Sequence, residues 1–420
     1  MRTVRRCCVR WMLTLAAVVM VCFSPAVAQT SYQVTDLGAL NNGVLGCAMG
    51  LNNQGWTESM DGYLDVSGNF VGRAVMNITG PQSTLKLKLD LGTLGGRDSW
   101  INWGGINERG DAVGLAETPV SDPNGEDFCG FGTGLTCRPF LWHEGDMGAL
   151  PTLGGNNGQA SAINNQGQIV GQAQTTVTDS GCPPYQTALP VLWEKGKVQQ
   201  LPTVGDDLDG FALDINDLGQ AVGLSGTCTT EVHVVLWENG AATDLPNLGN
   251  ASLNAALAIN NQGQIVGHSS PDGTTFLAVL WENGVIKNLG TLAGDFASAA
   301  TGINEKGQVV GSTLDANFNW SHGFIWQNGV MIDLNTLFPA NSNLYATMAN
   351  KINARGQISG MATVLSGPDA GNIHAFLATP VNASVGASAA EFAATHGKPA
   401  VPANVQKELL RGFGLGRFSQ

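Results

Sequence analysis

The chain has 420 residues, only 13% of them charged, and a net charge of −13. A chain this acidic repels phosphate backbones and anionic head groups, which argues against nucleic acid or an anionic membrane surface as a partner. Its 56 glycines lack collagen periodicity and indicate many tight turns.

Residues 1–28 have the features of a secretory signal peptide. Four arginines precede an apolar stretch at residues 11–23, and Ala26-Val27-Ala28 is a small-x-small cleavage signal. The apolar stretch is too short for a membrane-spanning helix, and no other segment approaches its length. We expect an exported chain that is periplasmic, extracellular or on the cell surface, and loss of the four arginines lowers its net charge from −13 to −17.

One motif, Ile-Asn-x-x-Gly-Gln-x-Val-Gly, recurs along the chain. Its copies lie at residues 163–171, 215–223, 259–267 and 303–311, with weaker copies at 106–114 and 352–360. Successive motif asparagines are 57, 52, 44, 44 and 49 residues apart. Such an interval is typical of supersecondary units that bury their apolar faces by stacking on their neighbours.

Residues 251–292 show how one unit is expected to fold. Short apolar segments at 256–259, 264–267, 276–281 and 285–289 are separated by an Asn-x-x-Gly turn, a loop and an Asn-Gly turn. Four antiparallel strands in a unit of this length predict one blade of a β-propeller. A tryptophan ends the third strand of five units, and we expect it to pack between adjacent blades. These residues are Trp142, Trp193, Trp237, Trp281 and Trp326.

The ends of the repeat array predict how it closes. The fourth-strand pattern occurs seven times, and so does the Asn-x-x-Gly turn if residues 52–55 are the first copy, although residues 65–72 offer a second candidate for that hairpin. The array opens with an isolated fourth strand at 32–37 and stops after a third strand at 374–380. We therefore predict an all-β, seven-bladed β-propeller over residues 29–380 whose N-terminal strand completes the last blade and removes the open edges. An open solenoid, the alternative, would leave both half-units unpaired.

Residues 381–420 differ in composition from the repeats. Residues 381–394 are rich in Ala and Ser, and residues 398–402 contain two prolines, which indicates an extended linker. Residues 403–411 have the composition of two helical turns ended by Gly412. We expect a low-complexity linker followed by a C-terminal tail.

Five cysteines remain after the signal peptide, and export favours disulfides. Cys129 and Cys137 flank a glycine-rich loop, and a bond between them is expected to stabilise the fold by about 2–3 kcal/mol. Cys182 and Cys228 occupy the same insertion site in successive units, which suggests a bridge between units. Cys47 is left over and is expected to be a small buried apolar residue.

These motifs together resemble the HAF-repeat family of bacterial extracellular repeat proteins, whose hallmark is His-Ala-Phe ahead of a Leu-Trp hairpin. The triplet is intact only at residues 374–376, with variants at 322–326 and 233–237. Three other units have Arg or Leu in place of the His, which argues against a metal or catalytic role there. The resemblance covers nearly all of residues 32–380 and implies an exported repeat array without an assigned reaction.

The sequence contains few candidates for chemistry. It has no Gly-x-Ser-x-Gly, no phosphate-binding loop and no His-Glu-x-x-His, and its six histidines lack zinc-ligand spacing. Three acidic residues, Asp206, Asp207 and Asp209, are followed by Gly210 and suggest a calcium site, although a solvated turn is the simpler interpretation. We otherwise expect no metal, no cofactor and no catalytic residue.

Long insertions predict a binding surface. They follow the second strand of three units, at residues 117–138, 172–189 and 225–233. In a propeller these insertions share one face, here called the long-loop face, with the connections between blades. The Asn-x-x-Gly turns lie on the opposite face, here called the turn face. Variation on one face of a uniform scaffold is typical of binding surfaces, with neutral drift of loops as the alternative.

We therefore expect a secreted, non-catalytic scaffold that binds a glycan, a protein or a cell-envelope component through its long-loop face. One alternative is a polysaccharide lyase or glycoside hydrolase with carboxylates from successive connecting loops meeting at the channel mouth. The carboxylates in question are Asp98, Asp206, Asp207, Asp209 and Asp295. The other alternative is a structural cell-surface protein that assembles through its tail.

Overall fold

The computed structural model describes residues 30–101, 103–181, 185–227 and 232–381. The expected signal peptide lies outside this part of the chain, as does the C-terminal segment from residue 382. Cys182 and Cys228 also lie outside it, so their predicted bridge stays a prediction.

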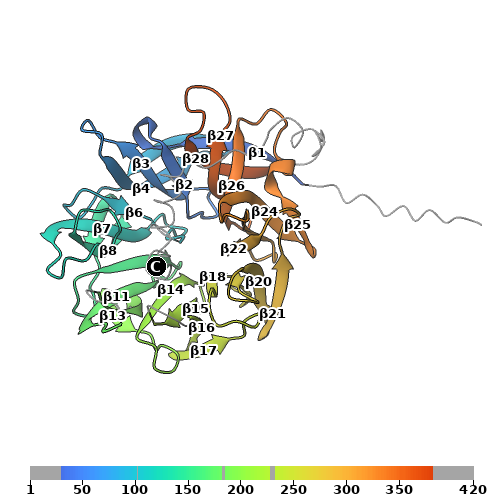
Figure 1. Cartoon of the computed structure of the whole chain (residues 1–420). Coiled ribbons are helices and arrows are strands. Elements are labelled where there is room, and N and C mark those ends of the chain that lie inside the picture. Colours follow the sequence, from blue (N-terminus) through green and yellow to red (C-terminus); the bar gives the residue numbers. More distant parts are fainter. Residues whose placement is uncertain (1–29, 102, 182–184, 228–231, 382–420) are drawn as a thin grey trace, which may run out of the picture.

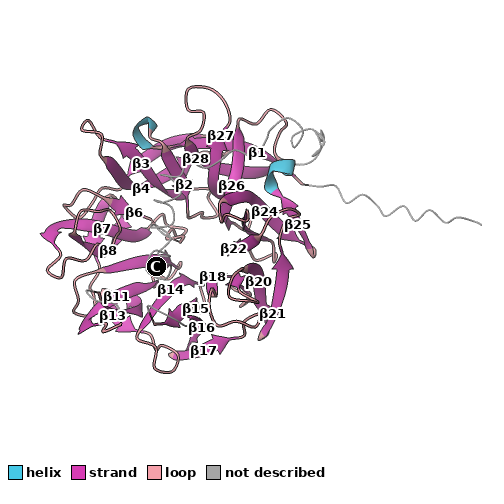
Figure 2. Cartoon of the chain, viewed as in Figure 1, coloured by secondary structure: helices cyan, strands magenta, loops and turns pink. Residues whose placement is uncertain are grey.

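The described chain is a ring of antiparallel β-sheets, the architecture of a β-propeller (Figure 1). Five sheets have four strands each, in chain order from the centre outwards. They contain β6 (Ser99–Trp100), β7 (Ala112–Ser121), β8 (Leu135–His143) and β9 (Asp146–Ala149); β10 (Gly158–Ile163), β11 (Ile169–Thr178), β12 (Gln186–Glu194) and β13 (Lys197–Gln200); β14 (Asp209–Ile215), β15 (Ala221–Gly226), β16 (Val232–Glu238) and β17 (Ala241–Leu245); β18 (Ala255–Ile259), β19 (Ile265–Ser269), β20 (Leu277–Glu282) and β21 (Val285–Gly290); and β22 (Ala297–Ile303), β23 (Val309–Leu314), β24 (Trp320–Gln327) and β25 (Val330–Asp333). Two short 3-10 helices, η1 (Leu40–Asn42) and η2 (Leu334–Leu337), interrupt the strands of the described residues (Figure 2).

The remaining strands form two blades joined into one eight-stranded sheet. One blade contains β2 (Leu45–Ala48), β3 (Thr57–Leu64), β4 (Phe70–Thr79) and β5 (Leu85–Asp90), and the other contains β26 (Leu344–Ile352), β27 (Ile358–Val364), β28 (Ile373–Val381) and β1 (Ser31–Gly38). The predicted pairing of the two ends is present, because β1 runs antiparallel to β28 from Ser31↔Val381 onwards. A single parallel bridge, Leu45↔Ile373, connects the two blades.

The first unit uses both of its candidate turns. The turn at Asn52 lies between β2 and β3, as in the other units, and the turn that begins at Asp65 joins β3 to β4 on the long-loop face. The two turns are therefore consecutive connections of one blade, and the irregularity of this unit reflects its long β3–β4 hairpin.

The motif glycines have two separate steric causes. Gly167, in the Asn-x-x-Gly turn, has a φ of +80°, which favours glycine. Gly171, at the end of the motif, faces the neighbouring innermost strand β10. A Cβ on Gly171 would be 2.1 Å from the carbonyl oxygen of Gln159 in that strand. That close approach follows from a register shift between Ala160 and Ala162, a bulge of a kind that recurs in the innermost strand of other blades.

The recurring tryptophans pack between blades, as predicted. Trp193 is 1% exposed and shares an apolar cluster with Val113 and Leu150 of the preceding blade. Its indole N–H also donates to the carbonyl of Pro151 at 2.7 Å, and Trp237 and Trp281 make the equivalent bonds to Pro202 and Pro246. Each of these side chains therefore holds two neighbouring blades together by burial and by a hydrogen bond.

Candidate functional site

Seven motif asparagines form a closed cycle of hydrogen bonds on the turn face. Each side-chain Nδ2 donates to the backbone carbonyl of the next asparagine at 3.0–3.4 Å, and the last donates to the first. None is more than 6% exposed. The members are Asn52, Asn107, Asn164, Asn216, Asn260, Asn304 and Asn353. The cycle joins every repeat to its neighbours, the first and last included.

Asn164 shows why the motif requires asparagine followed four residues later by glutamine. Its Oδ1 accepts from the backbone N–H groups of Gln166 and Gln168 at 3.0 and 2.9 Å. Its Nδ2 donates to Gln168 Oε1 at 2.8 Å and to the Asn216 carbonyl at 3.0 Å. The amide thus makes all four of its hydrogen bonds within the protein, leaving none for a ligand.

A second, outer set of bonds connects the residues that follow these asparagines. The backbone N–H of Asn165, for example, donates to the side-chain oxygen of Asp217 in the next unit at 2.9 Å. The same bond links Asn53 to Glu108, Glu108 to Asn165, Asp217 to Asn261, Asn261 to Glu305 and Ala354 to Asn53. Ala354 has no side-chain oxygen to accept from Glu305, so the outer set is interrupted at that one step.

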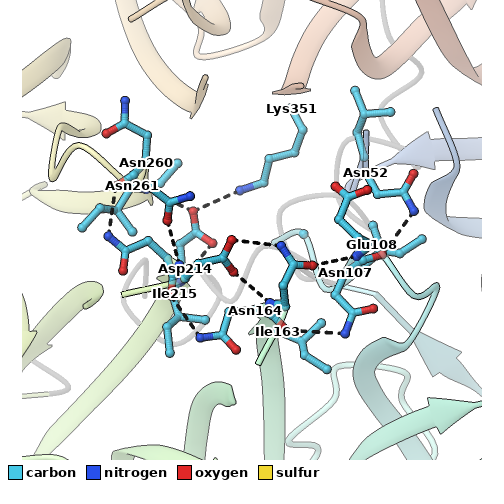
Figure 3. Close-up of a pocket in the computed structure, with 18 of the residues that line it drawn as sticks. Asn52, Asn107, Glu108, Ile163, Asn164, Asp214, Ile215, Asn260, Asn261 and Lys351 are labelled. Atoms are coloured by element: carbon cyan, nitrogen blue, oxygen red, sulfur yellow. Dashed lines mark hydrogen bonds and ion pairs between the residues drawn. The ribbon is translucent and has the colours of Figure 1, made fainter. Parts of the chain in front are cut away.

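A cavity of about 190 Å³ opens on the axis of the ring at this turn face (Figure 3). Its wall contains the isoleucines that precede five of the asparagines, namely Ile106, Ile163, Ile215, Ile259 and Ile303. Gly104, Asp214 and Lys351 also line it, and Glu108, Asp217 and Glu305 of the outer set surround it. The cavity therefore has an acidic rim and one partly buried charged pair.

The charged pair occupies a repeat position at which every other repeat has a glycine or an alanine. Two residues before the motif asparagine, the sequence has Gly50, Gly105, Ala162, Asp214, Ala258, Gly302 and Lys351. Asp214 and Lys351 approach one another across the cavity, with 3.5 Å between Oδ2 and Nζ (Figure 3). Backbone N–H groups of Ile215 and Ile259 hold the two oxygens of Asp214 at 3.0 and 3.1 Å. Burial raises the pKa of the Asp214 carboxyl, and the Lys351 charge counteracts this only partly.

Glu58 of β3 lies beside Gly50 and Gly105 of the same layer but is not among the residues that line the cavity. Its side chain is fully buried, and its carboxylate meets the backbone N–H of Gly105. Its Oε1 lies 2.7 Å from the place where a Cβ on Gly50 would be, and 3.1 Å from that of Gly105. The carboxylate therefore fills the space left by these two small residues. Burial raises its pKa well above the usual value, and the Gly105 N–H and the Lys351 charge offset this only in part.

The carboxylates predicted to meet at the channel mouth do not converge there. Asp207 and Asp295 are bound within their own blades, and Asp98 and Asp209 bond to backbone N–H groups of the preceding blade. Asp206 is exposed. These contacts give no support to the alternative of a catalytic set at the channel mouth, because Asp98, Asp207, Asp209 and Asp295 each bind a group within their own blade or in the preceding blade.

The structure also gives no support to the calcium site predicted at Asp206, Asp207 and Asp209. Asp207 Oδ2 accepts from Ser225 at 2.6 Å and lies 2.8 Å from His233 Nδ1, while Asp209 Oδ1 accepts from the backbone of Ala188 at 2.7 Å. In the part of the chain that the structure describes, no group of three His, Cys, Asp or Glu side chains is arranged to hold a metal ion. Asp207 Oδ2 and Asp209 Oδ1 are thus engaged in contacts within the protein, and the calcium site stays a prediction.

The histidine of the repeat pairs with an aspartate on the long-loop face. His322 Nδ1 lies 2.7 Å from Asp295 Oδ2, and His374 Nδ1 lies 2.9 Å from Asp36 Oδ1. Ser321 also approaches His322, but at the same Nδ1 atom, and its hydroxyl donates to Asp295 at 2.6 Å. In a catalytic triad, serine and aspartate bind different nitrogens of the imidazole ring. Here both bind Nδ1, so the three residues form a structural contact and not a catalytic triad.

The longest insertion is an extended hairpin that docks on the next blade. β7 and β8 reach into residues 117–138, and Cys129 is bonded to Cys137 as predicted, with Cα atoms 6.0 Å apart. Glu126 accepts from the backbone of Gln186 at 2.8 Å, and Asp122 accepts from Asn157 at 2.7 Å. The remaining cysteine, Cys47, is buried, as expected.

Large exposed apolar side chains gather on the long-loop face. Among the described residues, eight of the thirteen lie at strand ends or in loops of that face: Leu64, Val66, Val120, Val177, Leu208, Leu253, Phe296 and Phe318. The phenylalanines belong to an aromatic cluster in which the Phe318 ring lies 5.6 Å from that of Phe296 and 6.1 Å from that of Phe276. Phe318 has a φ of +58°, a strained conformation that turns a large ring outwards at 43% exposure.

No protein-family model matches the chain, and neither does any curated protein. Among solved structures it is similar to YCF48 bound to D1 peptide, at 10% identity over 85% of this chain and 97% of that chain, with a TM-score of 0.44. The propeller domain of the Trilobed protease from Pyrococcus furiosus matches at 10% identity over 69% of this chain and 97% of that domain, with a TM-score of 0.37. Acylaminoacyl peptidase matches at 13% identity over 76% of this chain, which spans half of that protein, with a TM-score of 0.45. Likenesses this distant carry nothing about function. Within the described residues, no helix has the length and apolar character that crossing a membrane requires.

Proposed function

We propose that the protein is an exported, non-catalytic binding scaffold, a closed ring of seven HAF-like blades that docks its ligand on the long-loop face. The cycle of seven asparagines and the pairing of β1 with β28 support the blade number and the closure. The signal-like residues 1–28 and the Cys129–Cys137 bond support export to an oxidising compartment.

The observation that carries this proposal is the distribution of exposed apolar side chains. The turn face directs its amides and backbone groups into the two sets of hydrogen bonds between repeats. The long-loop face instead exposes Phe296 and Phe318, whose rings pack near the partly buried Phe276, together with aliphatic side chains around the ring. Exposed apolar groups of this kind mark interaction surfaces. Aromatic faces bind both sugar rings and apolar protein groups, so the ligand is a glycan, a protein or another cell-envelope component.

Point substitutions test this surface more cleanly than loop deletion, because removing residues 117–138 would also remove the contacts of Asp122 and Glu126 with the next blade. The variant Phe318→Asn deletes an exposed ring, and asparagine tolerates the positive φ, so its melting temperature should equal or exceed that of the wild type. Phe296→Ser extends the change to a second ring. Val285→Ser and Val330→Ser are matched controls, since both valines are exposed on the turn face.

The measurement is co-sedimentation with insoluble cell-wall polysaccharide and with cell-envelope fractions, before and after protease treatment of those fractions. We expect the wild type and the valine variants to be retained and the Phe296→Ser/Phe318→Asn variant to lose at least tenfold in affinity. Protease sensitivity would identify a protein ligand. Equal retention of all variants would overturn the proposal, and absence of any retention would favour the structural surface role.

A further inference from the structure

The aromatic cluster of the long-loop face lies where two neighbouring blades meet, and this surface is here called the aromatic junction (Figure 1). Phe276 precedes β20 of one blade, whereas Phe296 precedes β22 and Phe318 precedes β24 of the next. The carbonyl of Phe276 accepts from the backbone N–H of Ser298 at 3.0 Å, which joins the two blades at this point. Phe296 and Phe318 are 40% and 43% exposed, so an apolar surface faces solvent at the junction.

The aromatic junction also carries negative charge. Each loop that supplies a ring supplies an aspartate one to four residues before it, and these are Asp272, Asp295 and Asp315. Residues 246–337, which make up the two blades, contain two lysines and no arginine. Lys287 Nζ lies 4.6 Å from the centre of the Trp326 ring, and Lys306 belongs to a turn on the turn face. The junction therefore combines exposed rings with carboxylates and has no lysine or arginine of its own.

Asp272 is the carboxylate that is best placed to meet a ligand. It is exposed, and the backbone N–H groups of Thr275 and Thr274 lower its pKa to about 2, so it is ionised at neutral pH. Both N–H groups bind Oδ1 at 2.8 Å, whereas Oδ2 accepts, among the described residues, only from the Thr275 hydroxyl at 3.2 Å. Burial lowers the pKa of His268, whose ring lies 4.9 Å from that of Phe276, to about 4. That imidazole therefore adds no positive charge beside Asp272.

We infer that the aromatic junction binds an arginine-bearing segment of a partner protein, with the guanidinium paired to Asp272 and apolar side chains against Phe296 and Phe318. A guanidinium donates to carboxylates and also stacks on aromatic rings, so it matches both features of the surface. Anionic polymers are repelled there, a neutral glycan gains nothing from the charge, and a second copy docked through the same face brings like charge. The inference rests on the proposed function and narrows its ligand to a basic protein segment.

The test titrates the wild-type protein into dye-labelled, capped pentapeptides and follows fluorescence anisotropy. One peptide alternates leucine and arginine, a second has citrulline, the neutral isostere, for each arginine, and a third has serine for each leucine. We expect saturable binding of the leucine–arginine peptide, with a Kd below about 1 mM that rises with added salt, and about tenfold weaker binding of both analogues. Equal binding of the citrulline peptide would overturn the inference, as would displacement of the leucine–arginine peptide by cellohexaose, a neutral glycan.

Matched variants assign the binding to the junction. Asp272→Asn keeps an acceptor for the N–H groups of Thr274 and Thr275 but removes the charge. It should weaken binding of the leucine–arginine peptide about threefold to fivefold and leave the citrulline peptide unchanged. Asp369→Asn, which removes an exposed charge from another loop of the same face, is the control and should bind as the wild type does. Equal losses in both variants would overturn the inference, because the net charge of the protein would then attract the peptide.

The retention experiment on cell-envelope fractions separates this inference from the proposed function. We expect Asp272→Asn to lose retention in part and Phe296→Ser/Phe318→Asn to lose it further. If the phenylalanine variant alone loses retention and the leucine–arginine peptide does not bind, the long-loop surface is right and the arginine ligand is wrong. If every variant is retained like the wild type, the proposed function itself is wrong.

Discussion

At the scale of single residues, position in the repeat determines whether a polar group is structural or available. The motif asparagines were recognisable from the sequence as turn residues, but their cycle was not, because each bond joins residues at least 44 positions apart. Asp214 and Lys351 could have been singled out from the sequence, because the other repeats have Gly or Ala at the equivalent position. Glu58 could not, because its carboxylate reaches the layer only through the space beside Gly50 and Gly105.

Burial of Glu58 makes stability depend on pH in a definite direction. Because its pKa is raised in the folded state, the folded protein binds the proton more tightly than the unfolded chain. The free energy of unfolding therefore falls as pH rises from about 4.3, the unfolded pKa, towards the folded pKa, by about 1.4 kcal/mol for each unit between them. Glu58→Gln removes this loss, so we expect it to be more stable than the wild type at pH 8, with the difference shrinking towards pH 4.

Urea unfolding at several pH values measures this effect, with the exposed Glu194→Gln as control. A wild type and a Glu58→Gln variant that differ by the same free energy at pH 4 and pH 8 would contradict it.

At the scale of elements, the reference unit predicted its four strands correctly, since β18 to β21 coincide with the expected segments within a residue or two. The insertions were less predictable. Residues 117–138 were expected to be a loop, yet strand pairing continues to Ser121↔Leu135. Threonine, cysteine and proline in that segment gave no clear alternation, and the partner that orders it, Asn157, belongs to the next blade. Local sequence thus defines a blade, whereas contacts between blades define its insertions.

The interruption at Ala354 predicts a stabilising substitution. Ala354→Asn supplies the missing side-chain oxygen for the backbone N–H of Glu305 and completes the outer set of bonds. An exposed hydrogen bond of this kind is expected to raise the free energy of unfolding by about 0.5 kcal/mol. Chemical denaturation measures the gain, with Ala354→Leu as a control that adds size without an acceptor. A loss of stability in Ala354→Asn relative to the leucine variant would refute the prediction.

The tryptophan hydrogen bonds between blades predict that Trp→Phe variants lose different amounts of stability, depending on whether the indole N–H has a partner. Trp281→Phe keeps an aromatic ring but deletes the bond to the Pro246 carbonyl, which should cost about 1–2 kcal/mol beyond the loss of ring volume. Trp326→Phe is the matched control, because the equivalent carbonyl belongs to Gly290 and accepts from Ser298 instead. Thermal unfolding of both variants compares the two costs, and equal losses would show that the bond contributes nothing.

At the scale of the whole molecule, the two ends of the chain support each other. β1 buries Tyr32 and Leu37, at 3% and 1% exposure, against the last blade. Removing residues 31–38 should therefore cost about 3–6 kcal/mol from these two side chains alone, and it leaves an edge of β28 unpaired. We expect a much lower melting temperature for the shortened chain and partial recovery when a synthetic peptide of residues 31–38 is added in excess. A shortened chain with the melting temperature of the wild type would contradict this.

The pairing of β1 with β28 also imposes an order on how the molecule is made. The strand that emerges first finds its partner only when the last strand emerges, since Asp36 and His374 are 338 positions apart. Until then β1 has no neighbour, and every incomplete product carries an exposed sheet edge of the kind that associates with other chains. A chain truncated before residue 373 therefore lacks the partner of β1, and the ring can close only after β28 has been made.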